Sequence, residues 1–269
     1  MARNNWSEEE LILTLSVYFQ LPFGRLNRTT PEVIELASLL DNRTANSAAM
    51  RLCNFAACDP AITGTVGPAG TIRSGLVGGM STCKPIWDKY SNDKEQLFLK
   101  AAQIRADRLH KTVEETLSDS SQKSLKGLKG ETRKQMVNLR VNQDAFRNMI
   151  LNNYENKCAI TGIDIPELLV ASHIIPWADR EDTRLDPENG ICLSPLYDKA
   201  FDRGYIGVKK DYTIVLSSDL SKKIHKTYFQ KYFQPLNGLS IALPYDHKPN
   251  KDYLEYHLDM IFEKHKSII

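Results

Sequence analysis

The residues best suited to chemistry lie in one stretch of the chain, residues 158–208. Its single histidine, His173, ends an apolar, β-favouring run that Pro166 and Pro176 bound. An Asn-Gly step follows at Asn189, and an Asp-rich turn comes after it. A neutral imidazole can take a proton from water, and carboxylates bind hard cations. These groups in this order favour metal-assisted cleavage of a phosphodiester bond.

Two short strands and a helix must position these groups. Residues 168–175 predict the first strand and residues 191–193 the second. The turn at residues 187–190 joins them, because Asn and Gly tolerate positive φ, and a long polar loop lies within the hairpin. Ser194 as N-cap and Pro195 at the first helical position then predict a helix start.

That helix carries two carboxylates. Asp198 and Asp202 are four residues apart and therefore share one helical face. Two strands and a helix, with a histidine on the first strand, predict a compact site for a hard cation.

These elements together resemble the HNH endonuclease family, which has a ββα-metal fold. The family pattern reads C-x-x-[CT]-G, A-S-H-I-x-P-W, N-G-[LI]-x-L and [HD]-x-x-F-D-x-G. In this chain the four parts correspond to residues 158–162, 171–177, 189–193 and 198–204. Residues 143–147 resemble the helix that precedes the motif in the family. The resemblance rests on several spaced elements in the right order.

The resemblance implies a role for each matching residue. His173 is the general base that deprotonates water, and Asn189 pins the loop and orients the histidine. Asp198 stands where the family normally has a metal-binding His. Asp202 falls where some members carry a further ligand; the alternative is that it closes the helix or pairs with Arg203. Many relatives have Asp or His in place of Ser172, whose hydroxyl is a weak ligand.

The expected ion follows from this ligand set. A shell of carboxylates, water and substrate phosphate favours Mg²⁺ or Mn²⁺ over Zn²⁺. Relatives with two C-x-x-C pairs hold a structural zinc, but here Cys158 is followed by Thr161, and Cys192 stands alone. We expect no structural zinc and a hairpin that apolar packing holds together.

Composition sets broad limits. The 35 Lys and Arg almost balance the 33 Asp and Glu, so any basic surface for nucleic acid must be local. Five cysteines without regular spacing favour free thiols in a reducing cytosol. The polar N-terminus lacks a signal-peptide core, and no apolar stretch is long enough to span a bilayer. We expect a cytoplasmic protein without membrane contact.

The fold class expected is α+β, with a helical N-terminal domain before the ββα-metal domain. The predicted boundaries are 1–118 for the helical domain, 119–141 for a flexible basic linker and 142–269 for the nuclease domain. Helices are expected after Ser7, after Thr30 and after Thr44. The last two are compatible with a helix-turn-helix that presents Arg51 to DNA, or with an ordinary helical hairpin.

Apart from Arg51, the candidate DNA contacts lie in the basic segment before the motif and on the helix of the motif. The linker and the segment after it are rich in lysine and arginine, which suit a phosphate backbone; the alternative is a solvated linker. The candidates are Arg51, Lys126, Lys129, Arg133, Lys134, Arg140, Lys199 and Arg203. After the motif, a hairpin, a basic aromatic segment at 222–233 and an amphipathic helix at 253–264 are expected.

The function expected is cleavage of double-stranded DNA in restriction or phage defence. One site per chain needs two chains for a double-strand break, so a homodimer is expected. Two alternatives stay open at this point. One is a DNA-binding regulator with a degenerate site, which Ser172 favours; the other is an effector that degrades DNA with little specificity.

Overall fold

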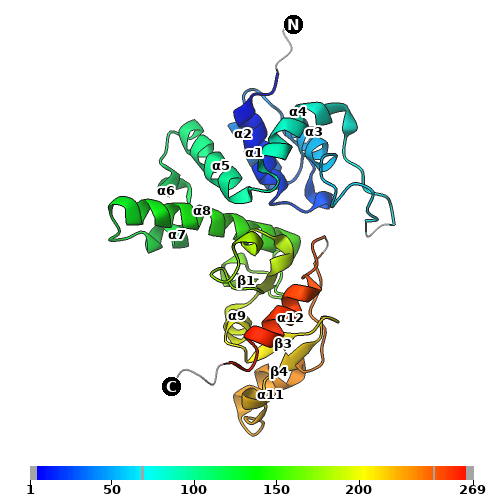
Figure 1. Ribbon diagram of the computed structural model, residues 1–269, viewed down its shortest axis with the longest axis vertical. Helices are drawn as coiled ribbons and strands as arrows, with labels where there is room; N and C mark the ends of the chain where they lie inside the picture. The colour runs from blue at the N-terminus through cyan, green and yellow to red at the C-terminus, as the bar shows by residue number, and fades with distance from the viewer. Residues whose placement is uncertain (1–4, 68–69, 245, 265–269) are drawn as a thin grey trace. The chain divides into compact units, whose positions relative to one another are not determined.

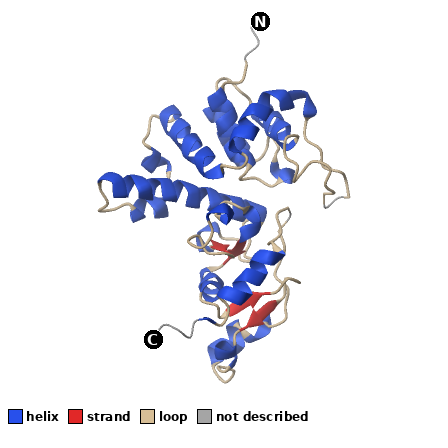
Figure 2. Cartoon of the chain, viewed as in Figure 1, coloured by secondary structure: helices blue, strands red, loops and turns tan. Residues whose placement is uncertain are grey.

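The structure is a computed structural model that describes residues 5–67, 70–244 and 246–264. The chain divides into two compact units, Met1–Ala145 and Phe146–Ile269 (Figure 1). Helices dominate, and the four named strands all belong to the C-terminal unit (Figure 2). The α+β class and the order of a helical region before the motif are confirmed. The expected polar N-terminus begins with residues 1–4, which lie outside the described part.

The N-terminal unit is helical, and its core is formed mainly by α1 to α5. Its elements are α1 (Glu8–Tyr18), η1 (Phe23–Arg25), α2 (Pro31–Leu39), α3 (Ala45–Ala56), η2 (Val77–Gly79), α4 (Met80–Tyr90), α5 (Lys94–Arg108), α6 (Val113–Thr116) and α7 (Asp119–Ser124).

The expected helix starts are confirmed. Ser7 and Glu10 form a reciprocal capping box at α1, and the Thr44 side chain accepts a hydrogen bond from the Ser47 N–H at α3. Glu10 is almost fully buried, and Arg43 Nε lies 2.9 Å from its carboxylate. Burial alone would raise the pKa of Glu10, but the hydrogen bonds and charge of Arg43 hold it below its usual value.

The segment expected to be a flexible linker is instead helical. It contains α7 and the first half of α8 (Gly130–Asn153), and the division between the two units falls within α8. Asp144 explains this order: its carboxylate accepts hydrogen bonds from the Ser118 and Ser121 hydroxyls, which ties α7 to α8. The predicted boundaries at 118 and 141 rested on a polar composition that did not reveal these contacts.

The described part of the C-terminal unit contains two antiparallel hairpins, with short helices and 3-10 turns around them. Its strands are β1 (Val170–His173), β2 (Gly190–Leu193), β3 (Ile206–Val208) and β4 (Ile214–Leu216). The helices are α9 (Pro195–Asp202), α10 (Ser218–Ser221), α11 (Thr227–Tyr232) and α12 (Lys251–Met260), with 3-10 turns η3 (Pro166–Leu168), η4 (Glu181–Thr183), η5 (Pro187–Asn189) and η6 (Gln234–Leu236).

Helix α9 packs on β1, and α12 packs on β3. The two hairpins are therefore joined through α9 and the closing helix. His257 of α12 is 1% exposed and stacks on Phe201 of α9, with ring centroids 3.7 Å apart. Its Nε2 donates a hydrogen bond to the Phe201 carbonyl, 3.1 Å away, so this histidine has a packing role.

No helix within the described part of the chain is long and apolar enough to cross a membrane.

Candidate nuclease site

The register of the β1–β2 hairpin fixes where the two candidate residues of β1 lie. Ser172 pairs with Ile191, and His173 pairs with Gly190, so both candidate residues stand at the C-terminal end of β1. Neighbouring residues of a strand point to opposite faces. The Ser172 hydroxyl accordingly lies towards Asp198 on α9, whereas the His173 ring lies against α8.

The His173 imidazole is held between two aromatic rings. It stacks on Phe146, with ring centroids 3.7 Å apart and 13° between the planes. Trp177 meets it edge-on at 5.5 Å. Its Nε2 donates a hydrogen bond to the Arg184 carbonyl at 3.1 Å. These contacts fix the position of the ring and its tautomer, because a nitrogen that donates to a carbonyl must carry the proton.

The remaining ring nitrogen of His173, Nδ1, makes no hydrogen bond with any residue that the structure describes. Burial lowers the pKa of His173 to about 4, which the hydrogen bond to the Arg184 carbonyl counteracts only in part. At neutral pH the ring is therefore uncharged, with a lone pair on Nδ1. A histidine in this state can accept a proton.

Asn189 is fully buried and organises the loop between the strands. Its Oδ1 accepts a hydrogen bond from the Ile175 N–H at 2.8 Å, and its Nδ2 donates to the Ile175 and Thr183 carbonyls, each at 3.1 Å. Thr183 directly precedes Arg184, whose carbonyl binds His173. Asn189 thus holds the loop whose backbone orients the imidazole.

The turn at residues 187–190 was expected because Asn and Gly tolerate positive φ. That reason was wrong, because neither Asn189 nor Gly190 has a positive φ. Gly190 is extended, with φ −136°. A Cβ on Gly190 would overlap the end of the Ile150 side chain and lie 2.9 Å from Phe146. Glycine is needed here so that α8 can approach the hairpin, which in turn places Phe146 against His173.

Helix α9 begins as expected, with Pro195 at its first position after Ser194. Tyr197, Ala200 and Phe201 are its buried face, which leaves Asp198 half-buried and Asp202 exposed at its edge. The two carboxylates repel each other electrostatically.

Both acidic groups have raised pKa values. Burial raises the pKa of Asp198, which the Ser172 hydroxyl and Lys199 partly oppose. For Asp202, partial burial of the carboxyl and the charge of Asp198 raise the pKa to about 6, against the effect of Lys199 and Arg203. The Ser172 Oγ is buried and completes no hydrogen bond of ordinary geometry with a described residue, although its hydroxyl lies close enough to favour ionised Asp198.

Ser172, Asp198 and Asp202 fit a hard divalent cation. All three offer oxygen, the mutual repulsion of the carboxylates would be relieved by a cation, and the orphaned Ser172 Oγ has a lone pair to give. Three or more His, Cys, Asp or Glu side chains do not gather as a metal site anywhere in the described ranges. Water and substrate oxygens would have to complete the coordination.

The Cys158 thiol helps to join the hairpin to α9. Its Sγ accepts hydrogen bonds from the Ser194 N–H at 3.2 Å and the Thr161 N–H at 3.4 Å. Cys158 and Cys192 are both buried and free.

The candidate DNA contacts divide into exposed and internal side chains. Lys126, Lys129, Lys134, Lys199 and Arg203 are exposed.

Two of the candidate arginines, Arg133 and Arg140, form hydrogen bonds within the N-terminal unit. Arg133 binds Glu114 and the Leu125 carbonyl, and Arg140 Nε donates to Ser124 Oγ at 2.8 Å. These bonds anchor α8 on the segment before it, so both arginines have a structural role that spacing did not reveal.

Arg51 was proposed to read DNA from α3, and its contacts count against this. Its guanidinium stacks over Trp6 and donates to the Gly79 carbonyl at 3.1 Å. Asn54 is also occupied, since its Nδ2 donates to the Leu76 carbonyl. The third helix therefore uses its polar side chains to hold the N-terminal unit together, as in the alternative of a helical hairpin.

Sequence reasoning missed Phe146 and Arg184 as parts of the site. The signal for Phe146 was present, because residues 143–147 resemble the helix that precedes the motif. Its neighbour Arg147 donates to the carbonyls of Leu169, at 2.6 Å, and Pro166, at 2.7 Å, which fixes α8 to the start of β1. The contribution of Arg184 comes from its backbone, and no side-chain pattern reports it.

The comparison with protein families agrees with this geometry. Residues 158–209 match the family model described as HNH endonuclease, which confirms the resemblance drawn from the motif. The chain thus carries an HNH endonuclease domain, which implies a nuclease that hydrolyses nucleic acid. Nucleases of this type generally use a divalent metal ion. No curated protein matches the chain.

Proposed function

We propose that the protein is a metal-dependent endonuclease that hydrolyses phosphodiester bonds of double-stranded DNA, with His173 as the general base. The observation that carries this proposal is the state of the imidazole. Its Nε2 is committed to the Arg184 carbonyl, its Nδ1 has a free lone pair, and its low pKa keeps the ring neutral. Nδ1 would take the proton from the attacking water.

The acidic pair supplies the other half of the site. Asp198 and Asp202, with weak help from Ser172, would hold Mg²⁺ or Mn²⁺. The bound ion would neutralise charge on the scissile phosphate and the leaving oxygen. Ser172 and His173 are adjacent on β1, so the acidic pair and the base flank the same end of one strand. Asn189 acts as a positioning residue through the loop that carries Arg184.

The substrate and setting are part of the proposal. Exposed Lys126, Lys129, Lys134, Lys199 and Arg203 would contact the phosphate backbone. Two chains would together cut both strands as a homodimer. A role in restriction or phage defence in the cytoplasm fits a nuclease joined to a separate helical unit, which would supply target choice.

Plasmid cleavage tests the proposal. The wild-type protein is incubated with supercoiled plasmid and Mg²⁺ or Mn²⁺, beside a His173→Ala variant and a His110→Asn control. His110 is an exposed histidine outside the motif, and its positive φ of 54° is a conformation that asparagine tolerates. We expect His173→Ala to lose about 10²- to 10⁴-fold in rate and the control to keep its activity. Equal rates for all three proteins would exclude His173 as the base.

A non-catalytic regulator is the second candidate. The observation in its favour is that the described residues contain no group of three His, Cys, Asp or Glu ligands. Such a protein would bind DNA without cutting it, with or without the ion.

Discrete fragments in the plasmid assay would support a restriction enzyme, and a continuous smear would support an effector of low specificity.

A further inference from the structure

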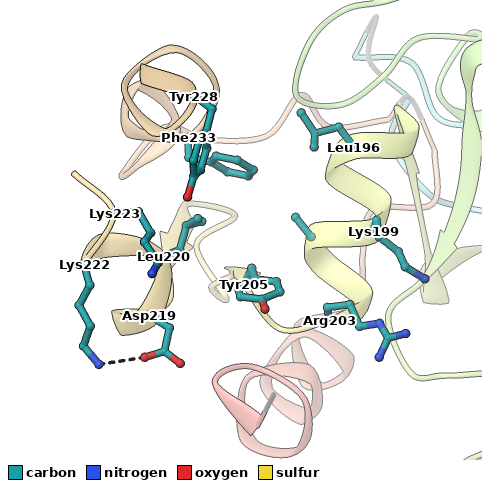
Figure 3. A pocket seen from close by; sticks show the side chains of 11 residues that line it. Leu196, Lys199, Arg203, Tyr205, Asp219, Leu220, Lys222, Lys223, Tyr228 and Phe233 are labelled. Atoms are coloured by element: carbon teal, nitrogen blue, oxygen red, sulfur yellow. Dashed lines mark hydrogen bonds and ion pairs between the residues drawn. The ribbon is translucent and has the colours of Figure 1, made fainter. Parts of the chain in front are cut away.

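A pocket of ≈ 670 Å³ lies within the C-terminal unit, between α9 and the α10–α11 segment (Figure 3). Leu196 and Lys199 of α9 and Arg203, which directly follows α9, lie on one side, and Lys223, Tyr228 and Phe233 lie on the other side. The nuclease motif assigns no role to this pocket. Its volume lies in the range that small-molecule sites occupy.

Three aromatic side chains line the pocket, and two of them are exposed. Tyr228 is 47% exposed and Tyr205 is 38% exposed, whereas Phe233 is buried at 8%. In Figure 3 the Tyr205 side chain lies between the two walls. Large exposed rings beside an apolar floor are suited to stack on a planar ligand such as a nucleobase.

The charge of the lining is positive. Lys222 is paired with Asp219 at 2.9 Å, which neutralises the acidic group of the lining. Lys199, Arg203 and Lys223 form no ion pair with any residue in the described part of the chain. Three uncompensated cations beside exposed aromatic rings match a ligand that combines a planar ring with a phosphate.

Two of these cations also lie near the candidate site. Lys199 and Arg203 act electrostatically on Asp202, which sits beside Asp198. In Figure 3 their stems line the pocket while their charged ends extend away from it. A phosphate on these ends would therefore lie between the aromatic pocket and the acidic pair.

We propose that this pocket holds one unpaired nucleotide of the DNA strand, its base against Tyr205 and Tyr228 and its phosphate on Lys199 and Arg203. The proposal rests on the proposed nuclease function and adds a structural preference to it. DNA in which a nucleotide is already unpaired would be favoured, since extruding a base from an intact duplex costs a few kcal/mol.

A strand fits this surface better than a free nucleotide. Beyond the pocket, α11 and the turn before it carry further exposed basic side chains, at His225, Lys226 and Lys231. These side chains do not line the pocket. They would contact neighbouring phosphates of a DNA strand, whereas a mononucleotide would not reach them.

Binding without cleavage tests the pocket. Fluorescence anisotropy in EDTA compares a fully paired duplex, the same duplex with one unpaired thymidine, and dTMP as competitor. The proteins are the wild type, Tyr228→Ala, Tyr228→Phe and Lys209→Gln, whose exposed lysine lies outside the pocket. Thermal melting of each protein shows that it is folded.

We expect the wild type to prefer the duplex with the unpaired thymidine. Tyr228→Ala should weaken that complex by about 5- to 150-fold, the usual effect of one stacked base. The affinity of Tyr228→Ala for the fully paired duplex should equal that of the wild type. Tyr228→Phe should restore the preference for the unpaired thymidine, and Lys209→Gln should bind both duplexes as the wild type does. An unchanged preference in Tyr228→Ala overturns the proposal, and so does dTMP binding as tightly as the strand.

Cleavage with Mn²⁺ separates this proposal from the nuclease function. If the wild type fails to cut any DNA but shows the Tyr228-dependent preference, the nuclease function fails and the pocket stands. If the wild type cuts DNA and Tyr228→Ala changes neither binding nor preference, the pocket proposal fails alone.

Discussion

The imidazole of His173 lies flat against the phenyl ring of Phe146, with the ring centroids 3.7 Å apart. Phe146 is 2% exposed, so one face of the imidazole is covered by a fixed side chain of α8. The ring edge is fixed separately, by the hydrogen bond from Nε2 to the Arg184 carbonyl. Two independent contacts thus determine where Nδ1 points.

Phe146→Leu should lower the rate of DNA cleavage by about 10-fold or more, because small displacements of a catalytic group are costly. It should also raise the pKa of His173 towards its ordinary value, since water gains access to the ring. Single-turnover rates and an NMR titration of the imidazole measure the two effects.

Phe98→Leu is the matched control for this change. Phe98 is 3% exposed in α5, so its loss creates a comparable cavity in the N-terminal unit. Both variants should melt at lower temperature, and only Phe146→Leu should change the cleavage rate and the titration. If both variants cleave equally well, stacking on Phe146 does not position the base.

Asn189→Ala should cost about 2–4 kcal/mol of unfolding free energy, because it leaves the buried N–H of Ile175 and two carbonyls without partners. Asn189→Asp should also be destabilising, since a carboxylate cannot donate to the carbonyls of Ile175 and Thr183. Urea denaturation measures both. A variant as stable as the wild type would contradict the loop-pinning role of Asn189.

The parts that could be predicted from the sequence are those that short-range chemistry decides. Ser7 and Glu10 cap α1 within one helical turn, and Pro195 fixes the start of α9. The order of strand, strand and helix needed no knowledge of the core. The same holds for Asp198 and Asp202, whose shared face follows from the helical repeat alone.

The parts that could not be predicted depend on partners distant in sequence. Glycine is needed at position 190 because the Ile150 side chain of α8 leaves no room for a Cβ there, whereas the sequence suggested that the glycine serves a turn. Arg133 looked like a phosphate contact, but Glu114 and two carbonyls hold it. Residues 119–141 looked flexible because their composition is polar, and Asp144 orders them.

Gly190→Ala should destabilise the C-terminal unit by about 1–3 kcal/mol, the range for overpacking in a core. The new methyl group would overlap the Ile150 side chain, whose Cδ1 and Cγ1 lie in its path. Adding Ile150→Val removes Cδ1 and should restore part of the loss. Melting temperatures of the single and double variants measure this coupling, and strictly additive losses would show that Ile150 is not the obstacle.

Mn²⁺ affinity should fall as the pH drops through 6, because the ion needs ionised carboxylates and the pKa of Asp202 is raised to about 6. The raised pKa also means that ionised Asp202 destabilises the metal-free fold above that pH. Asp202→Asn should therefore bind Mn²⁺ more weakly at pH 8 while melting at higher temperature in EDTA. Calorimetric titration and thermal melting measure the two effects. A lower melting point for the metal-free variant would contradict this account.

The C-terminal unit should lose stability in acid because of His257. Burial lowers its pKa to about 4, from 6.5 in an unfolded chain, so the unfolded state takes up the proton first. The stabilisation is complete above pH 6.5 and is lost as the pH falls towards 4, by about 3 kcal/mol. His173 shifts in the same direction and adds to the loss.

Trp177 can report this transition, since the other two tryptophans, Trp6 and Trp87, belong to the N-terminal unit. In a Trp6→Phe/Trp87→Phe background, urea midpoints are measured from pH 8 to pH 4 with His257 or with His257→Asn. The substitution should lower stability at pH 8, where the stacking on Phe201 is lost, and roughly halve the fall between pH 6.5 and 4. An equal fall in both proteins would mean that His257 can be protonated without unfolding. The shift would then belong to His173, whose ring is less buried and can reach water through Nδ1.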